Sequence, residues 1–172
     1  MKKTKIINPF PGDSVYDEVS SPIGKLTLIA SSAGLHAIQW DSDREKPADL
    51  CLSKNQKIIE QTKKQLEEYF QGRRKIFDLP LAVTGTDFQI EAWKELSKIP
   101  YAATITYAEQ ATRIGNKNKA RAVGLANGLN PIPIIIPCHR VIGSNGNLVG
   151  FAGGLDKKTY LLNLEKNTTS LN

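Results

Sequence analysis

Length, composition and charge exclude several classes of protein. The chain has 172 residues, 40% of them hydrophobic, which is enough to bury a core in one medium domain or two small ones without covalent staples. Only two cysteines occur, Cys51 and Cys138, and no apolar run reaches transmembrane length, so we expect a soluble protein of the reducing cytoplasm. The formal net charge of +6 permits an anionic partner but does not require one.

The basic residues gather in one part of the chain. Between Glu109 and Asp156 the sequence contains no Asp or Glu. The cations in this stretch are Arg113, Lys117, Lys119, Arg121 and Arg140. An acid-free segment with its cations near a predicted helix is typical of proteins that contact phosphate backbones. A solvated basic face is the alternative interpretation.

The first half of the chain has the pattern of a small sheet with one helix. Residues 16–40 carry short runs of Ile, Leu, Val and Thr broken by turn-forming segments, which indicates a hairpin or meander. A turn-prone, charged patch follows over 41–49. Apolar residues at helical spacing predict a helix over 55–70 that ends at Gly72, and 73–83 is predicted to return to the sheet as a strand.

From Thr86 onward the pattern becomes helical. Thr86 or Asp87 is expected to cap a helix that stops before Pro100. Because strand-like sequence gives way to helix-like sequence at this point, we predict an amino-terminal domain over 1–85 and a second domain over 86–172.

Two further helices are predicted in the second domain. Thr106 is expected to cap a helix over 107–114 that ends at Gly115, and a helix rich in small residues follows over 118–129. Two short helices around a glycine-containing turn, the second basic at its start, match a helix-turn-helix pattern.

The segment over 131–140 carries the clearest chemical signal. It reads Pro-Ile-Pro-Ile-Ile-Ile-Pro-Cys-His-Arg, and its prolines favour a stiff, extended backbone that ends at Cys138. An ordinary thiol is only slightly ionised at neutral pH, and a neighbouring imidazole or guanidinium raises the ionised fraction. The pattern predicts a nucleophilic cysteine, although lone cysteines are often inert core residues.

Three segments around this cysteine occur in a distinctive order. They are Ala120-Arg121-Ala122-Val123-Gly124-Leu125-Ala126, Asn130-Pro131 and Ile136-Pro137-Cys138-His139-Arg140-Val141-Ile142. In this order they closely resemble the signature of the O6-alkylguanine-DNA alkyltransferases, with supporting matches over 86–165. The first half resembles that family's variable amino-terminal domain only in length and rough pattern. The resemblance implies an α+β fold, with a ribonuclease H-like domain of a small sheet plus a helix followed by a winged helix-turn-helix-like domain for DNA binding and catalysis.

The resemblance also implies a reaction and its residues. The reaction is direct reversal of DNA damage, a single and irreversible transfer of an alkyl group from O6-alkylguanine in duplex DNA to Cys138, without a cofactor. His139 would draw the thiol proton through a bridging water, since neighbours on an extended segment point to opposite sides. Glu165 would orient this histidine, and Asn130 would tie the recognition helix, the predicted helix over 118–129, to the active-site segment.

The damaged base lies inside the stacked duplex, so base flipping is implied as well. By resemblance Arg121 would enter the stack in place of the base, and Tyr107 would press on the target phosphate. The small residues of the recognition helix would allow a close approach to the minor groove. The residues expected at the DNA surface are Arg121, Tyr107, Ala122, Gly124, Lys119 and Arg140.

The flipped base is expected to enter a pocket formed late in the chain. Its lining, by resemblance, is Val141, Gly150, Phe151, Ala152 and Gly153. Two residues depart from the family pattern. Ala102 stands where many members have glycine, and whether alanine is tolerated there depends on the local φ angle. Ala152 stands where Ser or Thr is common, which bears on substrate range and rate.

No metal site is predicted. Outside the active site Cys51 and His36 are the only cysteine and histidine, too few for a four-ligand zinc site. We expect Cys51 to be a buried filler residue and His36 a hydrogen-bonded residue of the sheet. Trp40 and Trp93 are expected in the core.

The predicted partner is double-stranded DNA containing O6-alkylguanine, bound by a monomer. Clustering along DNA and activity on O4-alkylthymine are left open. The alternative function is a sensor or transcriptional regulator that recognises alkylated DNA without transfer, but such alkyltransferase-like proteins lack the acceptor cysteine. A Cys-His hydrolase is a third interpretation, against which the basic helical segment argues.

Overall fold

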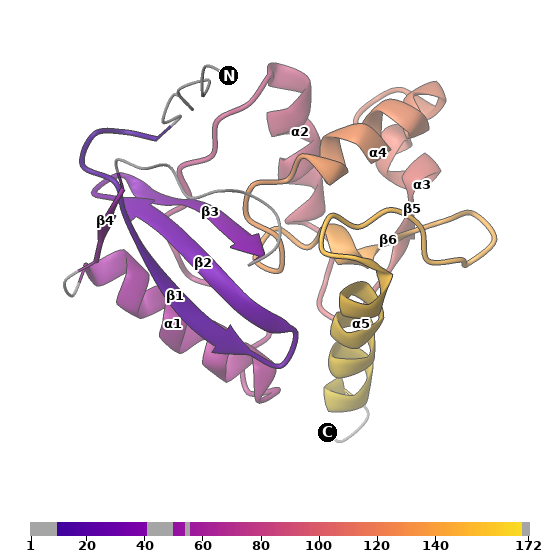
Figure 1. The fold of residues 1–172 in the computed structure, drawn as a ribbon. Helices are drawn as coiled ribbons and strands as arrows, with labels where there is room; N and C mark the ends of the chain where they lie inside the picture. Colours follow the sequence, from indigo (N-terminus) through magenta and orange to yellow (C-terminus); the bar gives the residue numbers. More distant parts are fainter. Residues whose placement is uncertain (1–9, 41–49, 54–55, 170–172) are drawn as a thin grey trace, which may run out of the picture.

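The computed structural model describes residues 10–40, 50–53 and 56–169. Within these residues the fold is α+β, as the sequence predicts. The first half forms a four-stranded sheet with a long helix against it, and the second half combines short helices with a two-stranded sheet (Figure 1).

The four-stranded sheet is an antiparallel meander with a short parallel edge strand. Its strands are β1 (Val15–Ser21), β2 (Gly24–Ser31), β3 (Gly34–Trp40) and β4 (Cys51–Leu52). The order is β3-β2-β1-β4, and only β4 pairs in parallel, with β1. The meander predicted over 16–40 is confirmed, whereas the charged patch predicted over 41–49 lies outside the described residues.

Helix α1 (Lys57–Phe70) packs against the sheet. The Gln56 side chain caps it by accepting a backbone hydrogen bond in the first turn. Gly72 follows its end with a φ of 73°, a left-handed conformation that suits glycine. Tyr69, in the last turn, is fully buried. The helix predicted over 55–70 is confirmed from residue 57, and residue 55 lies outside the described residues.

The strand predicted over 73–83 is wrong. This segment contributes only an isolated bridge between Leu81 and Leu35 on β3. One reason is a tertiary contact: the side chain of Gln65 on α1 accepts a hydrogen bond from the Asp78 N–H at 2.8 Å and donates to the Asp78 carbonyl at 2.7 Å. A helix side chain therefore satisfies backbone groups that a strand partner would otherwise bind.

Helices α2 and α3 begin at the predicted caps. α2 (Asp87–Leu96) follows Thr86 and α3 (Tyr107–Arg113) follows Thr106, each with a complete capping box. Gly115 follows α3 with a φ of 85°. The predicted boundaries hold here because cap residues act locally and need no tertiary partner.

The third predicted helix, over 118–129, begins later than expected. A 3-10 helix over Lys117–Lys119, capped by the Asn116 side chain, precedes α4 (Ala120–Gly128). The start of α4 has no side-chain cap, so the tighter turn in front of it takes the place of an N-cap. α3, the turn and α4 form the predicted helix-turn-helix.

Buried polar bonds join the helices of this unit. The side-chain amides of Gln110 on α3 and Asn127 on α4 bond each other reciprocally, at 2.7 and 3.1 Å. Trp93 on α2 donates its indole N–H to the Ala126 carbonyl at 2.9 Å. A fully satisfied buried network of this kind favours a single relative placement of the helices.

One hydrophobic cluster extends through both halves of the described chain. It includes Leu28 from the sheet, Leu66 from α1 and Ile132 from the second half, all fully or almost fully buried. Leu161 reaches it from α5 (Leu155–Thr169). The two halves therefore share a core rather than meeting at a separate polar interface.

Two non-glycine residues of the described chain have a left-handed backbone: Ala102, with φ 62°, and Ile134, with φ 76°. Such a conformation costs about 1 to 2 kcal/mol for an L-residue. At Ala102 it directs the N–H to a carboxylate oxygen of Glu165, 2.9 Å away. The glycine that the family pattern carries at this position would adopt the same angle without the cost.

Replacing Ala102 with glycine should therefore stabilise the protein. We expect Ala102→Gly to raise the free energy of unfolding by about 0.5 to 1 kcal/mol, the relief of strain being partly offset by the greater freedom of the unfolded chain. Urea denaturation measures the change. Ala103→Gly, the same replacement at a residue without a positive φ, is the control and should destabilise. Equal losses in the two variants would contradict strain at Ala102.

Candidate active site

The segment that carries Cys138 is a series of turns, not an extended strand. The backbone reverses at Ile134, and the Ile136 N–H donates to the Ile132 carbonyl at 2.9 Å. Cys138–Arg140 then forms one 3-10 turn. The predicted extended backbone is wrong because these local hydrogen bonds outweigh the preference of the prolines, and the argument that Cys138 and His139 face opposite sides no longer applies.

Asn130 ties this segment to the end of α4, as the sequence predicts for its position. Its side chain donates to the Ile136 carbonyl at 2.7 Å and accepts from the Ile132 N–H at 3.0 Å. Cys138 lies two residues after Ile136, whose carbonyl accepts this bond. One side chain thereby connects the end of α4 to the backbone that leads to the thiol.

The Cys138 thiol is buried, with 7% of the residue exposed. Burial raises its pKa, and a hydrogen bond from Asn130 and the positive charge of Lys158 oppose that rise. The expectation that the flanking Arg140 activates the thiol is not met, since its guanidinium is bound to Glu165. The thiol is therefore protonated at rest and needs a base.

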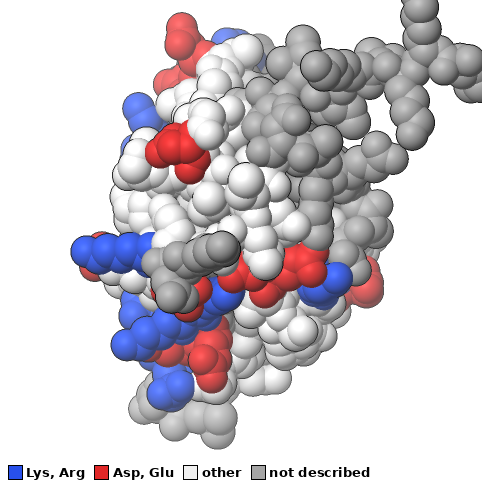
Figure 2. Space-filling view, turned by 60° about the vertical axis from the view of Figure 1, so that its left-hand side comes forward, with Lys and Arg blue, Asp and Glu red and all other residues white. Residues whose placement is uncertain are grey.

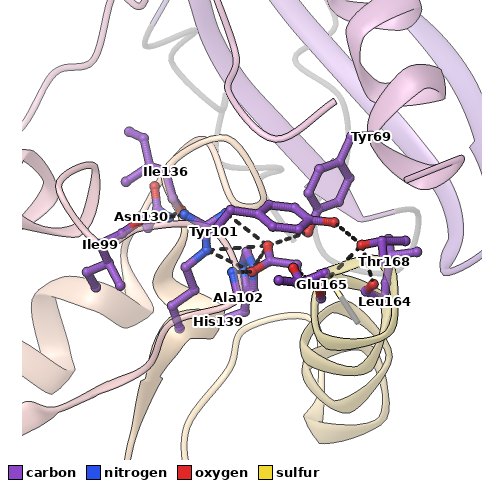
Figure 3. Close-up of polar contacts among 12 residues, drawn as sticks. Tyr69, Ile99, Tyr101, Ala102, Asn130, Ile136, His139, Leu164, Glu165 and Thr168 are labelled. Carbon is purple, nitrogen blue, oxygen red and sulfur yellow. Dashed lines mark hydrogen bonds and ion pairs between the residues drawn. The ribbon is translucent and has the colours of Figure 1, made fainter. Parts of the chain in front are cut away.

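Glu165 on α5 is the centre of the polar network. It is fully buried, and its carboxylate accepts from His139 Nε2 at 2.8 Å, Tyr69 Oη at 2.7 Å and Arg140 Nη2 at 2.9 Å (Figure 3). The second oxygen accepts from Ala102 N and from Arg140 Nε at 3.0 Å. Burial alone would raise the pKa of Glu165, but the hydrogen bonds from His139 and Arg140 hold it at about 2.

His139 is oriented as a base. An ionised Glu165 can only accept, so His139 Nε2 carries the proton and Nδ1 holds the lone pair. Nδ1 is buried and has no hydrogen-bond partner among the described residues. Burial lowers the pKa of His139 against the opposing effect of Glu165, which keeps the ring neutral at pH 7. The arrangement can accept a proton at Nδ1 and stabilise the resulting imidazolium.

Sequence reasoning missed Lys158 on α5. It is fully buried, and its ammonium donates to the carbonyls of Val141 at 2.6 Å and Val149 at 2.8 Å. It thereby fixes the loop after β6 (Val141–Ile142) and brings a positive charge near the thiol. The available signal was its position seven residues before Glu165, on the same face of one helix.

The residues predicted at the DNA surface divide into two groups. Arg121 and Lys119 are exposed at the start of α4, and Ala122 and Gly124 are half-buried beside them. A Cβ at Gly124 would lie 3.6 Å from the Tyr107 ring, an ordinary van der Waals contact, so packing does not require glycine at this position. Close approach of α4 to DNA therefore stays the prediction for Gly124.

The side chains of Tyr107 and Arg140, both predicted to contact DNA, form hydrogen bonds within the protein. Tyr107 donates its hydroxyl to the Val149 carbonyl at 2.9 Å, at the edge of the loop that Lys158 holds. Arg140 is only 6% exposed, and its guanidinium binds Glu165 and the Ile99 carbonyl. The predicted DNA contact of Arg140 is wrong, because a group committed to a buried carboxylate cannot also reach a phosphate.

The predicted pocket residues lie around a loop packed on the first sheet. Val141 is fully buried, whereas Gly150 and Ala152 are exposed. Phe151 packs on Trp40 at the end of β3 with ring centroids 5.9 Å apart, and a Cβ on Gly153 would lie 2.7 Å from the Trp40 ring.

A cleft of about 800 Å³ opens between β3 and the end of α4. Asn130 and Ala152 contribute to its lining, and Cys138 does not. Of the predicted pocket residues only Ala152 therefore borders this cleft.

The remaining predictions concern the first half. Cys51 is exposed, so its assignment as a buried filler is wrong: it lies on the short edge strand β4. His36 is confirmed as a hydrogen-bonded sheet residue, with Nε2 2.7 Å from Ser31 Oγ and Nδ1 2.8 Å from the Ala82 carbonyl. Trp40 and Trp93 are buried, as expected.

Three absences hold for the described part of the chain. No three His, Cys, Asp or Glu side chains converge in a way that could bind a metal ion. No helix combines the length and apolar character that a membrane crossing requires. On the face that carries the first sheet and α1, charges of both signs lie side by side and form no single basic patch (Figure 2), with Lys63 between Asp17 and Glu60.

A sheet-plus-helix domain joined to a helix-turn-helix, with a buried thiol next to a His-Glu pair, defines a DNA-binding protein with a cysteine nucleophile. Two family models match the chain: 6-O-methylguanine DNA methyltransferase, ribonuclease-like domain, over 14–83, and 6-O-methylguanine DNA methyltransferase, DNA binding domain, over 87–167. The chain belongs to the 6-O-methylguanine DNA methyltransferase family.

Individual relatives cover most of the chain. A methylated-DNA–protein-cysteine methyltransferase of Methanosarcina barkeri is 50% identical over 155 residues, which are 88% of this chain and 97% of that protein. One of Mycobacterium tuberculosis is 44% identical over 88% of this chain and 92% of that protein. The crystal structure of Mycobacterium tuberculosis OGT in complex with DNA superposes with a TM-score of 0.84 and 43% identity, covering 89% of this chain and 93% of that one.

The depressed pKa of Glu165 predicts a specific loss of stability in acid. Its pKa is about 2 in the folded protein against an ordinary 4.5, so its ionised form stabilises the fold above pH 4.5 and this contribution is lost as the pH falls through 2. We expect about 3 kcal/mol of the unfolding free energy to disappear over this range. Denaturation as a function of pH measures it.

Two variants separate Glu165 from other carboxylates. Glu165→Gln should be less stable than the wild type at pH 7 and should show a flatter dependence between pH 4.5 and 2. Glu91→Gln, at an exposed position on α2, should keep the wild-type slope. A Glu165→Gln protein with an unchanged slope would rule out the proposed ionisation.

Proposed function

We propose that this protein repairs DNA by direct reversal, as a methylated-DNA–protein-cysteine methyltransferase that moves the alkyl group of O6-alkylguanine in duplex DNA onto Cys138. The observation that carries the proposal is a buried thiol beside a neutral histidine, whose proton-accepting nitrogen is defined by Glu165, behind a helix-turn-helix. Membership of the family and the DNA complex of the Mycobacterium tuberculosis OGT support it.

The proposed reaction balances without a cofactor. The Cys138 proton passes to Nδ1 of His139, and the thiolate attacks the alkyl carbon in line with the bond to guanine O6. A C–S bond forms while the C–O bond breaks, and its electron pair leaves with guanine, which takes up the proton that the thiol gave. The product is a thioether with no easily displaced leaving group, so each molecule acts once.

Burial of the thiol implies base flipping. A guanine inside the stack cannot reach the thiol of a cysteine residue that is only 7% exposed, so the base must leave the duplex and enter the protein. Arg121, exposed at the first turn of α4, is proposed to occupy the gap in the stack, and Tyr107 to act beside the loop over 149–150. Lys119, Ala122 and Gly124 lie on or next to the same helix start and are proposed DNA contacts.

Further parts of the proposal concern organisation. We propose a boundary at residues 85 and 86, with the amino-terminal domain supporting the site and the second domain carrying DNA binding and the thiol. The protein is proposed to act as a monomer in the cytoplasm, where its two free cysteines stay reduced. The pocket for the flipped base is proposed to be bordered by Val141 and the loop over 150–153.

Intact-mass measurement tests the transfer. After incubation with duplex DNA that carries O6-methylguanine, the wild type should gain the mass of one methyl group, located on Cys138. Cys138→Ala should gain nothing, and Cys51→Ala, which removes the exposed thiol, should react like the wild type. An unmodified protein that still binds the damaged duplex would instead identify a sensor or regulator.

The role of Arg121 has a separate test. Arg121→Ala should slow reaction with duplex O6-methylguanine by about 10- to 100-fold, because flipping costs a few kcal/mol, and should leave reaction with free O6-benzylguanine unchanged. Rates of methylation and benzylation of Cys138 are compared by mass. Arg113→Ala, another exposed cation of the acid-free segment, is the control and should slow both reactions little. Equal losses of Arg121→Ala in both assays would refute insertion into the stack.

A further inference from the structure

One hydrogen bond to the buried carboxylate comes from the amino-terminal half. Tyr69, in the last turn of α1, donates its hydroxyl to Oε1 of Glu165 at 2.7 Å, across 96 residues of sequence (Figure 3). Both residues are fully buried. The bond crosses from the sheet-bearing half of the chain to α5, the helix that carries Glu165.

The tyrosine shares its acceptor atom with the catalytic histidine. Oε1 of Glu165 receives the Tyr69 hydroxyl and His139 Nε2, the latter at 2.8 Å. Donors that compete for one oxygen weaken each other, so the strength of the His139 bond depends on whether Tyr69 is present. Arg140 spans both oxygens, and Ala102 binds the other one.

We propose that Tyr69 is a positioning residue for alkyl transfer: its hydroxyl holds Glu165 in register with His139 and moderates the basicity of His139, so the amino-terminal half takes part in the proton relay. The kinetic side of this inference rests on the proposed function. Its structural side concerns only the bond between Glu165 and His139 and holds for the protein without substrate.

The hydroxyl is separable from the packing of the ring. The Tyr69 ring contacts the rings of Phe70, Phe77 and Tyr101, with centroids 5.5, 5.3 and 6.1 Å away. Tyr69→Phe removes one oxygen atom and keeps the ring, so we expect these contacts to be retained. Burial raises the pKa of Tyr69 well above its ordinary value, so the hydroxyl is a donor throughout the working pH range.

The charged groups around His139 determine the direction in which its pKa changes when the Tyr69 hydroxyl is removed. Without the Tyr69 hydroxyl, the negative charge on Oε1 is shared with fewer donors and attracts the Nε2 proton of His139 more strongly. Arg140 and Lys158 oppose imidazolium formation in both proteins, and Cys138 is a protonated thiol in both. The pKa of His139 should therefore rise in Tyr69→Phe.

Tyr101→Phe is the matched control. Tyr101 packs against Tyr69, and its hydroxyl bonds Thr168 on α5 at 2.7 Å instead of Glu165. The control removes the same atom from the same aromatic cluster. Placing 3-fluorotyrosine at position 69 is the converse change, because its more acidic hydroxyl is a stronger donor, and it removes nothing from the fold.

Two readouts are used. The first is the NMR signal of the His139 Nε2–H proton without substrate, in a chain that has only two histidines, so that His36→Gln assigns it. The second is the pH dependence of the rate of Cys138 benzylation by free O6-benzylguanine. Urea denaturation of each variant measures any loss of stability.

Tyr69→Phe should move the Nε2–H signal downfield and shift the acid limb of the rate profile to higher pH by about half a pH unit. The 3-fluorotyrosine protein should shift both in the opposite direction, and Tyr101→Phe should shift neither. Unchanged signals in both Tyr69 proteins, or equal shifts in Tyr101→Phe, would overturn the inference. A wild type that never gains the benzyl group would refute the proposed function alone, because the NMR readout needs no substrate.

Discussion

The carboxylate of Glu165 is the group on which the rest of the site depends. A buried charge is tolerated only where ion pairs and hydrogen bonds replace water, and here two side chains besides Arg140 and one backbone N–H supply them. The donors to this carboxylate come from α1, the loop after α2 and the turn at Cys138, and they bring these segments together with α5. The strained backbone of Ala102 belongs to this arrangement, since its N–H is one of the donors.

Chemical reactivity at Cys138 comes from this arrangement rather than from a permanently ionised thiol. Burial disfavours the thiolate, so the sulfur is unreactive until a base removes its proton. His139 is kept neutral by the same burial and is oriented by Glu165. Lys158 supplies a positive charge close to the sulfur while holding the loop over 149–150. Because the protein is proposed to react only once, burial of the thiol protects it from alkylation by other electrophiles.

The amino-terminal half contributes more than a covering layer. It shares one hydrophobic cluster with the second half, supports the loop over 150–153 through Trp40 and reaches Glu165 through Tyr69. Each of these contacts joins residues far apart in sequence. Asn130 joins the end of α4 to the backbone just before Cys138 through two part-buried hydrogen bonds.

Local signals in the sequence determined the meander and the caps at Thr86 and Thr106. A family resemblance determined the α+β class and placed Cys138, His139 and Glu165 in one site. Such features depend on adjacent residues or on a distinctive motif. Tertiary structure alone decided that 73–83 is not a strand, that Arg140 faces Glu165 instead of DNA, and that Lys158 is buried. The physical reason is common to all three: each depends on a polar partner at least eight residues away, and spacing along a chain does not reveal which buried group will satisfy which.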